Sequence, residues 1–170
     1  MSSPSSSVCL PAPALRPFIA HYAGGQAFGV PPGVYVGLPS RHVDLIISLG
    51  APINVVQMPN AAHRSATFSA LVSGLQDTPA IVRRGGDIHL LHLFLTPLGV
   101  RGLLGVSSSE IASAVVNLSD IWGRCATDLI ERLMEASTWS QRFAILDRAF
   151  LDRIKPFAAP SELAWAWRTL

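Results

Sequence analysis

The chain has 170 residues, enough for one domain with a full hydrophobic core and too few for two ordinary domains. Hydrophobic residues make up 49% of it and charged residues only 14%, so much of its apolar surface must be buried inside the domain or against a partner. The formal net charge is +2, and the only adjacent basic pair is Arg83-Arg84, which argues against a chain that holds DNA or RNA tightly by itself.

The ends and the apolar segments of the chain bear on its location. The first residues, MSSPSSS, lack the basic and apolar regions of a secretory signal. The longest nearly uncharged apolar stretch, Leu90 to Val100, is shorter than the roughly 20 residues that a membrane helix needs. These features predict a cytoplasmic protein without a membrane span. Cys9 and Cys125 suit neither a metal pair nor a disulfide framework.

Composition divides the chain into three parts. Residues 1–13 are rich in Ser and Pro, which predicts a disordered lead-in. A single ordered domain is then expected over residues 14–170, with a β-barrel part over 14–96 and a helical part over 97–170. In the β part, short apolar segments alternate with clusters of Gly, Pro and Asn, which is typical of many short antiparallel strands.

Two segments give the clearest strand patterns. In RHVDLIISLG, apolar residues alternate with a half-polar set that includes His42 and Asp44, so one face is expected in the core. In GDIHLLHLFLT, which contains His92 and Phe94, both faces are apolar. Such a strand is expected to be covered on both sides.

After Thr96-Pro97 the hydrophobic period changes from that of strands to that of helices. The motifs SSSE and TWSQ both have the spacing of a helix-capping box. Apolar stripes predict two longer helices, from Ser119 to Ala136 and from Thr138 to Ile154, and a last short helix at the end of the chain. The expected fold class is therefore α+β: an antiparallel cupin-like β-barrel or β-sandwich followed by a C-terminal bundle of amphipathic helices.

Four residues of the β part are candidate ligand-binding residues. His42 and Asp44 share a strand face about 7 Å apart, close enough to meet or to bracket a polar group of a ligand. The same pattern also fits a plain, water-exposed strand face. His92 and Phe94 lie on a largely apolar face and are the other pocket candidates, although a buried His bonded to a backbone carbonyl explains His92 equally well.

No catalytic motif is present: the sequence has no G-x-S-x-G, no G-x-G-x-x-G and no P-loop. We therefore predict a binding module without catalytic residues or cofactors. All five histidines lie in the β part, which leaves a small cupin-like metalloenzyme as the alternative, with His42, Asp44 and a further His as ligands. His89 and His92 point to opposite faces of one strand and cannot chelate one ion, so no metal site is assigned.

The helical stripes fit core packing, and their width also leaves room for an interface between two copies. Trp122, Leu129, Leu133 and Phe143 are the candidate dimer residues. The last segment, SELAWAWRTL, has too much apolar area for a frayed end, so it is expected to dock on this domain, on a second copy or on a further domain.

Four segments in order resemble the N-terminal regulatory region of one group of AraC-type bacterial transcriptional regulators. They are LPSRHVDLIISLG, LTPLGVRGLLGVSSSEIASAVVNLSDIWG, LIERLMEASTWSQRFAILDRAFLDRI and SELAWAWRTL. The resemblance covers about Leu15 to Leu170. In such regulators the segment matching WAWRTL leads into a pair of helix-turn-helix motifs that bind DNA, and this chain is expected to lack them.

The resemblance implies a cupin-like regulatory domain that holds a small effector, and helices that mediate dimerisation. We therefore expect a homodimer that senses an unknown small molecule and reaches DNA only through a C-terminal domain missing here. A ligand-free oligomerisation scaffold is a third interpretation beside the sensor and the metalloenzyme.

Overall fold

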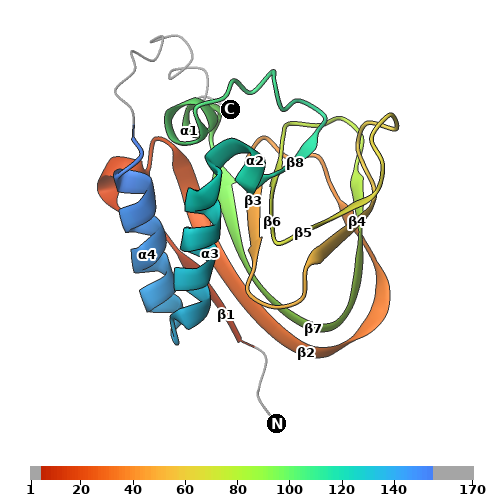
Figure 1. Ribbon diagram of the computed structural model, residues 1–170, viewed down its shortest axis with the longest axis horizontal. Helices are drawn as coiled ribbons and strands as arrows, with labels where there is room; N and C mark the ends of the chain where they lie inside the picture. The colour runs from red at the N-terminus through yellow and green to blue at the C-terminus, as the bar shows by residue number, and fades with distance from the viewer. Residues whose placement is uncertain (1–4, 155–170) are drawn as a thin grey trace.

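The computed structural model describes residues 5–154, in which a β half is followed by a helical half (Figure 1). The strands are β1 (Ser5–Cys9), β2 (Ile19–Gly37), β3 (Val43–Ser48), β4 (Ile53–Gln57), β5 (Ala66–Phe68), β6 (Ala70–Ser73), β7 (Ala80–Leu95) and β8 (Val115–Asn117). The helical elements are η1 (Pro13–Leu15), α1 (Pro97–Gly99), η2 (Val100–Leu104), α2 (Leu118–Trp122), α3 (Arg124–Glu135) and α4 (Trp139–Leu151). The predicted α+β class is confirmed.

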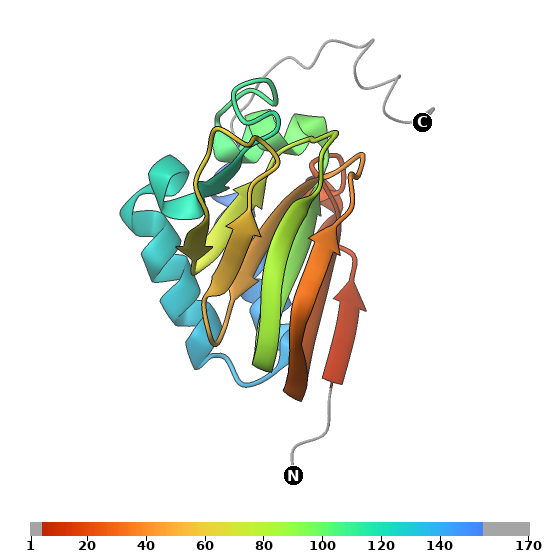
Figure 2. The same ribbon diagram turned by 90° about the vertical axis from the view of Figure 1, so that its right-hand side faces the viewer.

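The antiparallel sheet is built on one long ribbon, in which β2 pairs with β7. Its register runs from Ile19 opposite Leu95 to Gly37 opposite Ala80, and irregularities between Ala27 and Gly33 bend it. β2 occupies one edge of β7 along its whole length. On the other edge, β3 pairs with one end of β7 and β4 pairs with the other end. Figure 2 shows the resulting curved sheet.

The described strands form an open sheet, which corrects the expectation of a closed barrel. Their order is β1-β2-β7-β3-β6-β8, with β4 and β5 attached beside β7. A barrel closes only when its first and last strands pair. Here β1 pairs with β2 and β8 pairs with β6, so the two ends of the order stay apart.

One side of the sheet, which we call the outer face, is covered by α3 and α4 (Figure 1). Alternate residues of β3 and β7 point to it and are fully buried: Val43, Leu45, Ile47, Leu91, Leu93 and Leu95. The helices supply the opposing side chains, among them Leu129, Leu133, Leu146 and Phe150. The two long helices therefore cover the sheet, where a separate C-terminal bundle was expected.

The helix boundaries follow the local chemistry of the chain. The helix expected from Ser119 to Ala136 is divided into α2 and α3, because Gly123 adopts a positive φ of 58° between them. The capping box of TWSQ is confirmed at the start of α4. In SSSE, Ser107 and Glu110 form the same reciprocal bonds but close a turn instead of starting a helix. The short helix expected at the chain end lies outside the described residues.

The disordered lead-in predicted for residues 1–13 is wrong from Ser5 onward, because β1 adds to the edge of β2. The amino-acid composition does not reveal this strand, because the hydrogen bonds that pair it with β2 come from the backbone and not from its side chains. The following segment is also fixed: the Ala12 amide donates to Asp147 Oδ1 over 3.0 Å, and the Tyr22 hydroxyl donates to the same oxygen over 2.9 Å. Burial and that carboxylate raise the pKa of Tyr22, which keeps its phenol a donor.

The four candidate dimer residues are buried within the single chain. Trp122, Leu129, Leu133 and Phe143 are exposed by 7, 3, 0 and 6% and belong to the core under the outer face. This corrects the sequence-based choice, since the stripe chosen as an interface is the one that packs on the sheet. Among the described helices, none has the length and apolar character needed to cross a membrane.

Candidate functional site

The opposite side of the sheet, which we call the inner face, curves around a cavity. Asp44, Ile46 and Ser48 of β3 point to it, because they alternate with the core residues of the outer face. The cavity has a volume of about 160 Å³, and its apolar lining includes Ile46, Ile53, Val55, Leu71, Val82 and Leu90. Apolar cavities of about 150 Å³ hold molecules the size of benzene. The inner face therefore has the shape of a small-molecule site.

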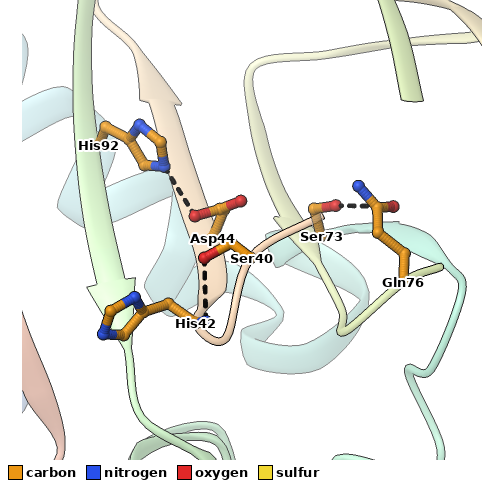
Figure 3. Close-up of polar contacts among 6 residues, drawn as sticks. All are labelled: Ser40, His42, Asp44, Ser73, Gln76 and His92. Atoms are coloured by element: carbon orange, nitrogen blue, oxygen red, sulfur yellow. Dashed lines mark hydrogen bonds and ion pairs between the residues drawn. The ribbon is translucent and has the colours of Figure 1, made fainter. Parts of the chain in front are cut away.

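Asp44 and His92 form the polar centre of this cavity. Asp44 Oδ1 lies 2.9 Å from His92 Nε2, and the two side chains are 21 and 27% exposed. The contact joins neighbouring strands, because Ile46 of β3 stands opposite His92 of β7. A carboxylate only accepts hydrogen bonds, so the contact requires the proton of the imidazole on Nε2. Figure 3 shows the pair beside Ser73 and Gln76.

Phe94 holds three histidines together on the same face. Its ring stacks on His21 with centroids 4.1 Å apart and on His92 with centroids 4.0 Å apart. His42 meets it edge-on at 6.0 Å. Burial, and after it the positive charge of neighbours, lowers the pKa of His21 and of His42. Both shifts favour the neutral form of the ring.

The structure brings the four predicted ligand-binding residues into one cluster, with roles that differ from those expected. Asp44 and His92 line the cavity, whereas His42 packs against Phe94 and directs its ring away from Asp44 (Figure 3). The partner of the carboxylate is thus the histidine of the next strand. Proximity along the strand favoured His42. Asp44 stands opposite Phe94, so His92 is its diagonal neighbour on β7, a position that long side chains can bridge.

Sequence reasoning missed several polar residues of the site, among them Ser48, Ser73 and Gln76. Ser73 Oγ donates to Gln76 Oε1 over 3.5 Å, and Ser48 Oγ donates to the Ala51 carbonyl over 2.6 Å. All of these residues line the cavity. Ser48 could have been found, because it shares the alternation of Asp44. Ser73 carries no such signal, since it ends β6, a four-residue strand that is buried throughout. Gln76 carries none either, because it lies in the irregular segment after β6.

His89 confirms that neighbouring histidines of β7 point apart. Its ring meets Trp139 of α4 edge-on at 5.4 Å, on the outer face. Nε2 of His89 is buried without a hydrogen-bond partner, and burial lowers the pKa of this residue. Within residues 5–154, no group of three or more His, Cys, Asp or Glu side chains is arranged to hold a metal ion.

A second hollow, of about 670 Å³, lies at the helical end of the molecule. It is lined by η2, α2, α3 and the end of α4, and it includes Trp122 and Ile154. Ile154, the last described residue, is part of its lining. The candidate site is the cavity of the inner face, whose walls are all described strands and loops.

No family model, curated protein or solved structure matches this chain.

Proposed function

We propose that this chain is the effector-sensing and dimerisation domain of a cytoplasmic AraC-type transcriptional regulator. In this proposal the curved sheet is a cupin-like half-barrel that binds a small molecule on its inner face. The bound molecule biases the position of α3 and α4, and through them a joined helix-turn-helix domain that contacts DNA. The chain acts by binding and not by catalysis.

The observation that carries the proposal is the inner-face cavity. An apolar lining with a few polar groups, here Asp44, His92 and Ser73, is the usual composition of small-molecule sites. The alternation of β7 supports the regulatory part, because its outer-face residues pack under α3 and α4 while its inner-face residues line the cavity. A ligand and the helices therefore contact the same strand.

The cavity also weighs against the other two interpretations. A scaffold that only joins copies does not need a hollow lined with polar side chains. A metalloenzyme using His42 and Asp44 needs a further His to converge with them, whereas the His42 ring packs on Phe94 and the carboxylate bonds to His92.

The proposal is tested by filling the cavity. Ile46→Phe adds volume to its wall, and Val34→Phe makes a comparable change at a residue of β2 that is 67% exposed and outside the cavity. We expect native mass spectrometry and thermal-shift screening with small apolar molecules to find ligands for the wild-type chain and for Val34→Phe. Ile46→Phe should lose them while remaining folded. Equal uptake by all three proteins would place binding elsewhere and contradict the proposal.

Dimerisation is tested separately by sedimentation equilibrium of the wild-type chain. We expect a dimer whose interface uses exposed residues of the helices, such as Met134 of α3 and Leu151 of α4, which are 56 and 42% exposed. A monomer at micromolar concentration would contradict this half of the proposal and leave the sensing half standing.

A further inference from the structure

We propose that the inner-face cavity takes a small organic cation: an apolar body about the size of one ring that carries a primary ammonium group bound to Asp44. This inference rests on the proposed binding function and names the chemical class of its ligand. Three properties of the cavity lead to it, namely its acceptors, its charge and its size.

The polar centre of the cavity offers hydrogen-bond acceptors. Asp44 Oδ1 receives the bond from His92 Nε2, and among residues 5–154 the carboxylate has no other hydrogen-bond partner. Asp44 is still 21% exposed and lines the cavity, so its remaining acceptor sites are open to a ligand. Because an ionised carboxylate cannot donate, the ligand has to bring the hydrogen.

The neighbouring hydroxyls add to this character. The hydrogen of Ser73 is used on Gln76, and the hydrogen of Ser48 is used on the Ala51 carbonyl. Ser73 also lines the cavity, and its hydroxyl oxygen can still accept a hydrogen bond; Figure 3 shows it beside the amide of Gln76. An ammonium group carries three donors and no acceptor, so it suits such a surface better than a hydroxyl or a carboxylate does.

The charge around Asp44 favours a cation. Burial lowers the pKa of His21 and of His42, which disfavours a positive charge on these neighbouring rings. The arginines that line the cavity, Arg83 and Arg84, lie toward the other end of β7, and the Arg84 guanidinium is stacked 3.9 Å from the centre of the Tyr35 ring. A hydrogen bond between an ammonium group and a carboxylate is about twice as strong as one between neutral groups.

The size and lining of the cavity limit the rest of the ligand. A volume of about 160 Å³ leaves room for roughly one ring. Side chains such as Ile46, Leu71 and Leu90 surround this space, so the body of the ligand is apolar. The polar group of the ligand then contacts the part of the cavity wall where Asp44 of β3 and His92 of β7 are paired.

The test compares three molecules of one shape and three charges: cyclohexylmethylamine, cyclohexylmethanol and cyclohexanecarboxylate. Each is titrated at pH 7 by isothermal calorimetry into the wild-type chain, into Asp44→Asn and into Asp77→Asn. Asn at position 44 keeps an acceptor for His92, and Asp77 is exposed and outside the cavity, so its variant is the matched control for loss of one charge.

We expect the amine to bind the wild-type chain and Asp77→Asn at least tenfold more tightly than the alcohol, and the carboxylate to give no heat. Asp44→Asn should bind the amine at least tenfold more weakly. Tightest binding of the carboxylate, or unchanged amine binding by Asp44→Asn, would overturn the proposal.

Failure of the ligand class differs from failure of the site. The wild-type chain could bind neutral molecules but not the amine, and Ile46→Phe could abolish that neutral binding. In that case the cation proposal is wrong and the sensing function stands. If the wild-type chain binds none of the three molecules and nothing in the small-molecule screen, both proposals fail.

Discussion

The outer and inner faces of the sheet use the same strands in opposite ways. On the outer face, Leu91 and Leu93 of β7 are fully buried beneath the helices. On the inner face, Leu90 and His92 are only partly buried and border a cavity. The outer face is closely packed under the helices, whereas the inner face borders open space and carries polar groups. A two-residue alternation along one strand therefore separates the side of the sheet that packs in the core from the side that borders the cavity.

The largest effect expected from this comparison is a difference in stability between two neighbouring positions. Leu93→Ala leaves a cavity in the outer core and should lower the free energy of unfolding by about 4 kcal/mol. Leu90→Ala removes a partly exposed side chain and should cost about 1 kcal/mol. Urea denaturation of both variants measures the difference. Similar losses would mean that the inner face is packed as tightly as the outer one.

The next largest effect is a difference in stability between alanine substitutions at two adjacent glycines of β2, Gly24 and Gly25. A Cβ at Gly24 would overlap the ring of Trp139, so Gly24→Ala should destabilise the fold by about 2 kcal/mol. A Cβ at Gly25 would have no atom within 4 Å, so Gly25→Ala should change stability by less than about 0.5 kcal/mol. Thermal unfolding of the pair is the measurement. If Gly24→Ala is neutral, then Trp139 does not lie against β2 as described.

The smallest expected effect is a dependence of stability on pH. Burial lowers the pKa of His21 and His42 from the ordinary value of 6.5, so below that value the unfolded chain binds more protons than the folded one. Stability is therefore full above pH 6.5 and is lost as the pH falls through the lowered values. The drop in Tm between pH 7.5 and 5.5 should be smaller in His21→Gln than in the wild-type chain.

His63 provides the control for this experiment, because it is exposed and makes no contact with the Phe94 cluster. His63→Gln should keep the full pH dependence. An identical drop in His21→Gln and His63→Gln would show that the inner-face histidines do not account for it.

Much of the fold could be predicted from periodicity. The alternation of β3, the change of period at Pro97 and the capping box at Thr138 are local signals, and each is confirmed. What failed depends on contacts between distant segments. β1 forms because its backbone pairs with β2. The sheet stays open because β1 pairs with β2 and β8 pairs with β6, so β1 and β8 do not pair with each other. No local composition carries such information.

The candidate site was predicted by residue type but not by pairing. His42, Asp44, His92 and Phe94 meet in one cluster, whereas the sequence placed them only as two pairs, each on a face of its own strand. The partner of Asp44 is decided by the register between β3 and β7, which the sequence of either strand alone does not specify. His21 was missed for the same reason, since it joins the cluster only through the pairing of β2 with β7.

In the proposed sensing function, the position of β7 between the cavity and the helices gives a regulatory signal a short path. His92 touches the cavity and Leu93, the next residue, lies in the core beneath the helices. A ligand that shifts the backbone at His92 therefore moves a residue under α3 and α4 across a single peptide bond. The proposed communication would need no chain of relays, because the cavity and the helix-covered core lie on the two sides of one strand.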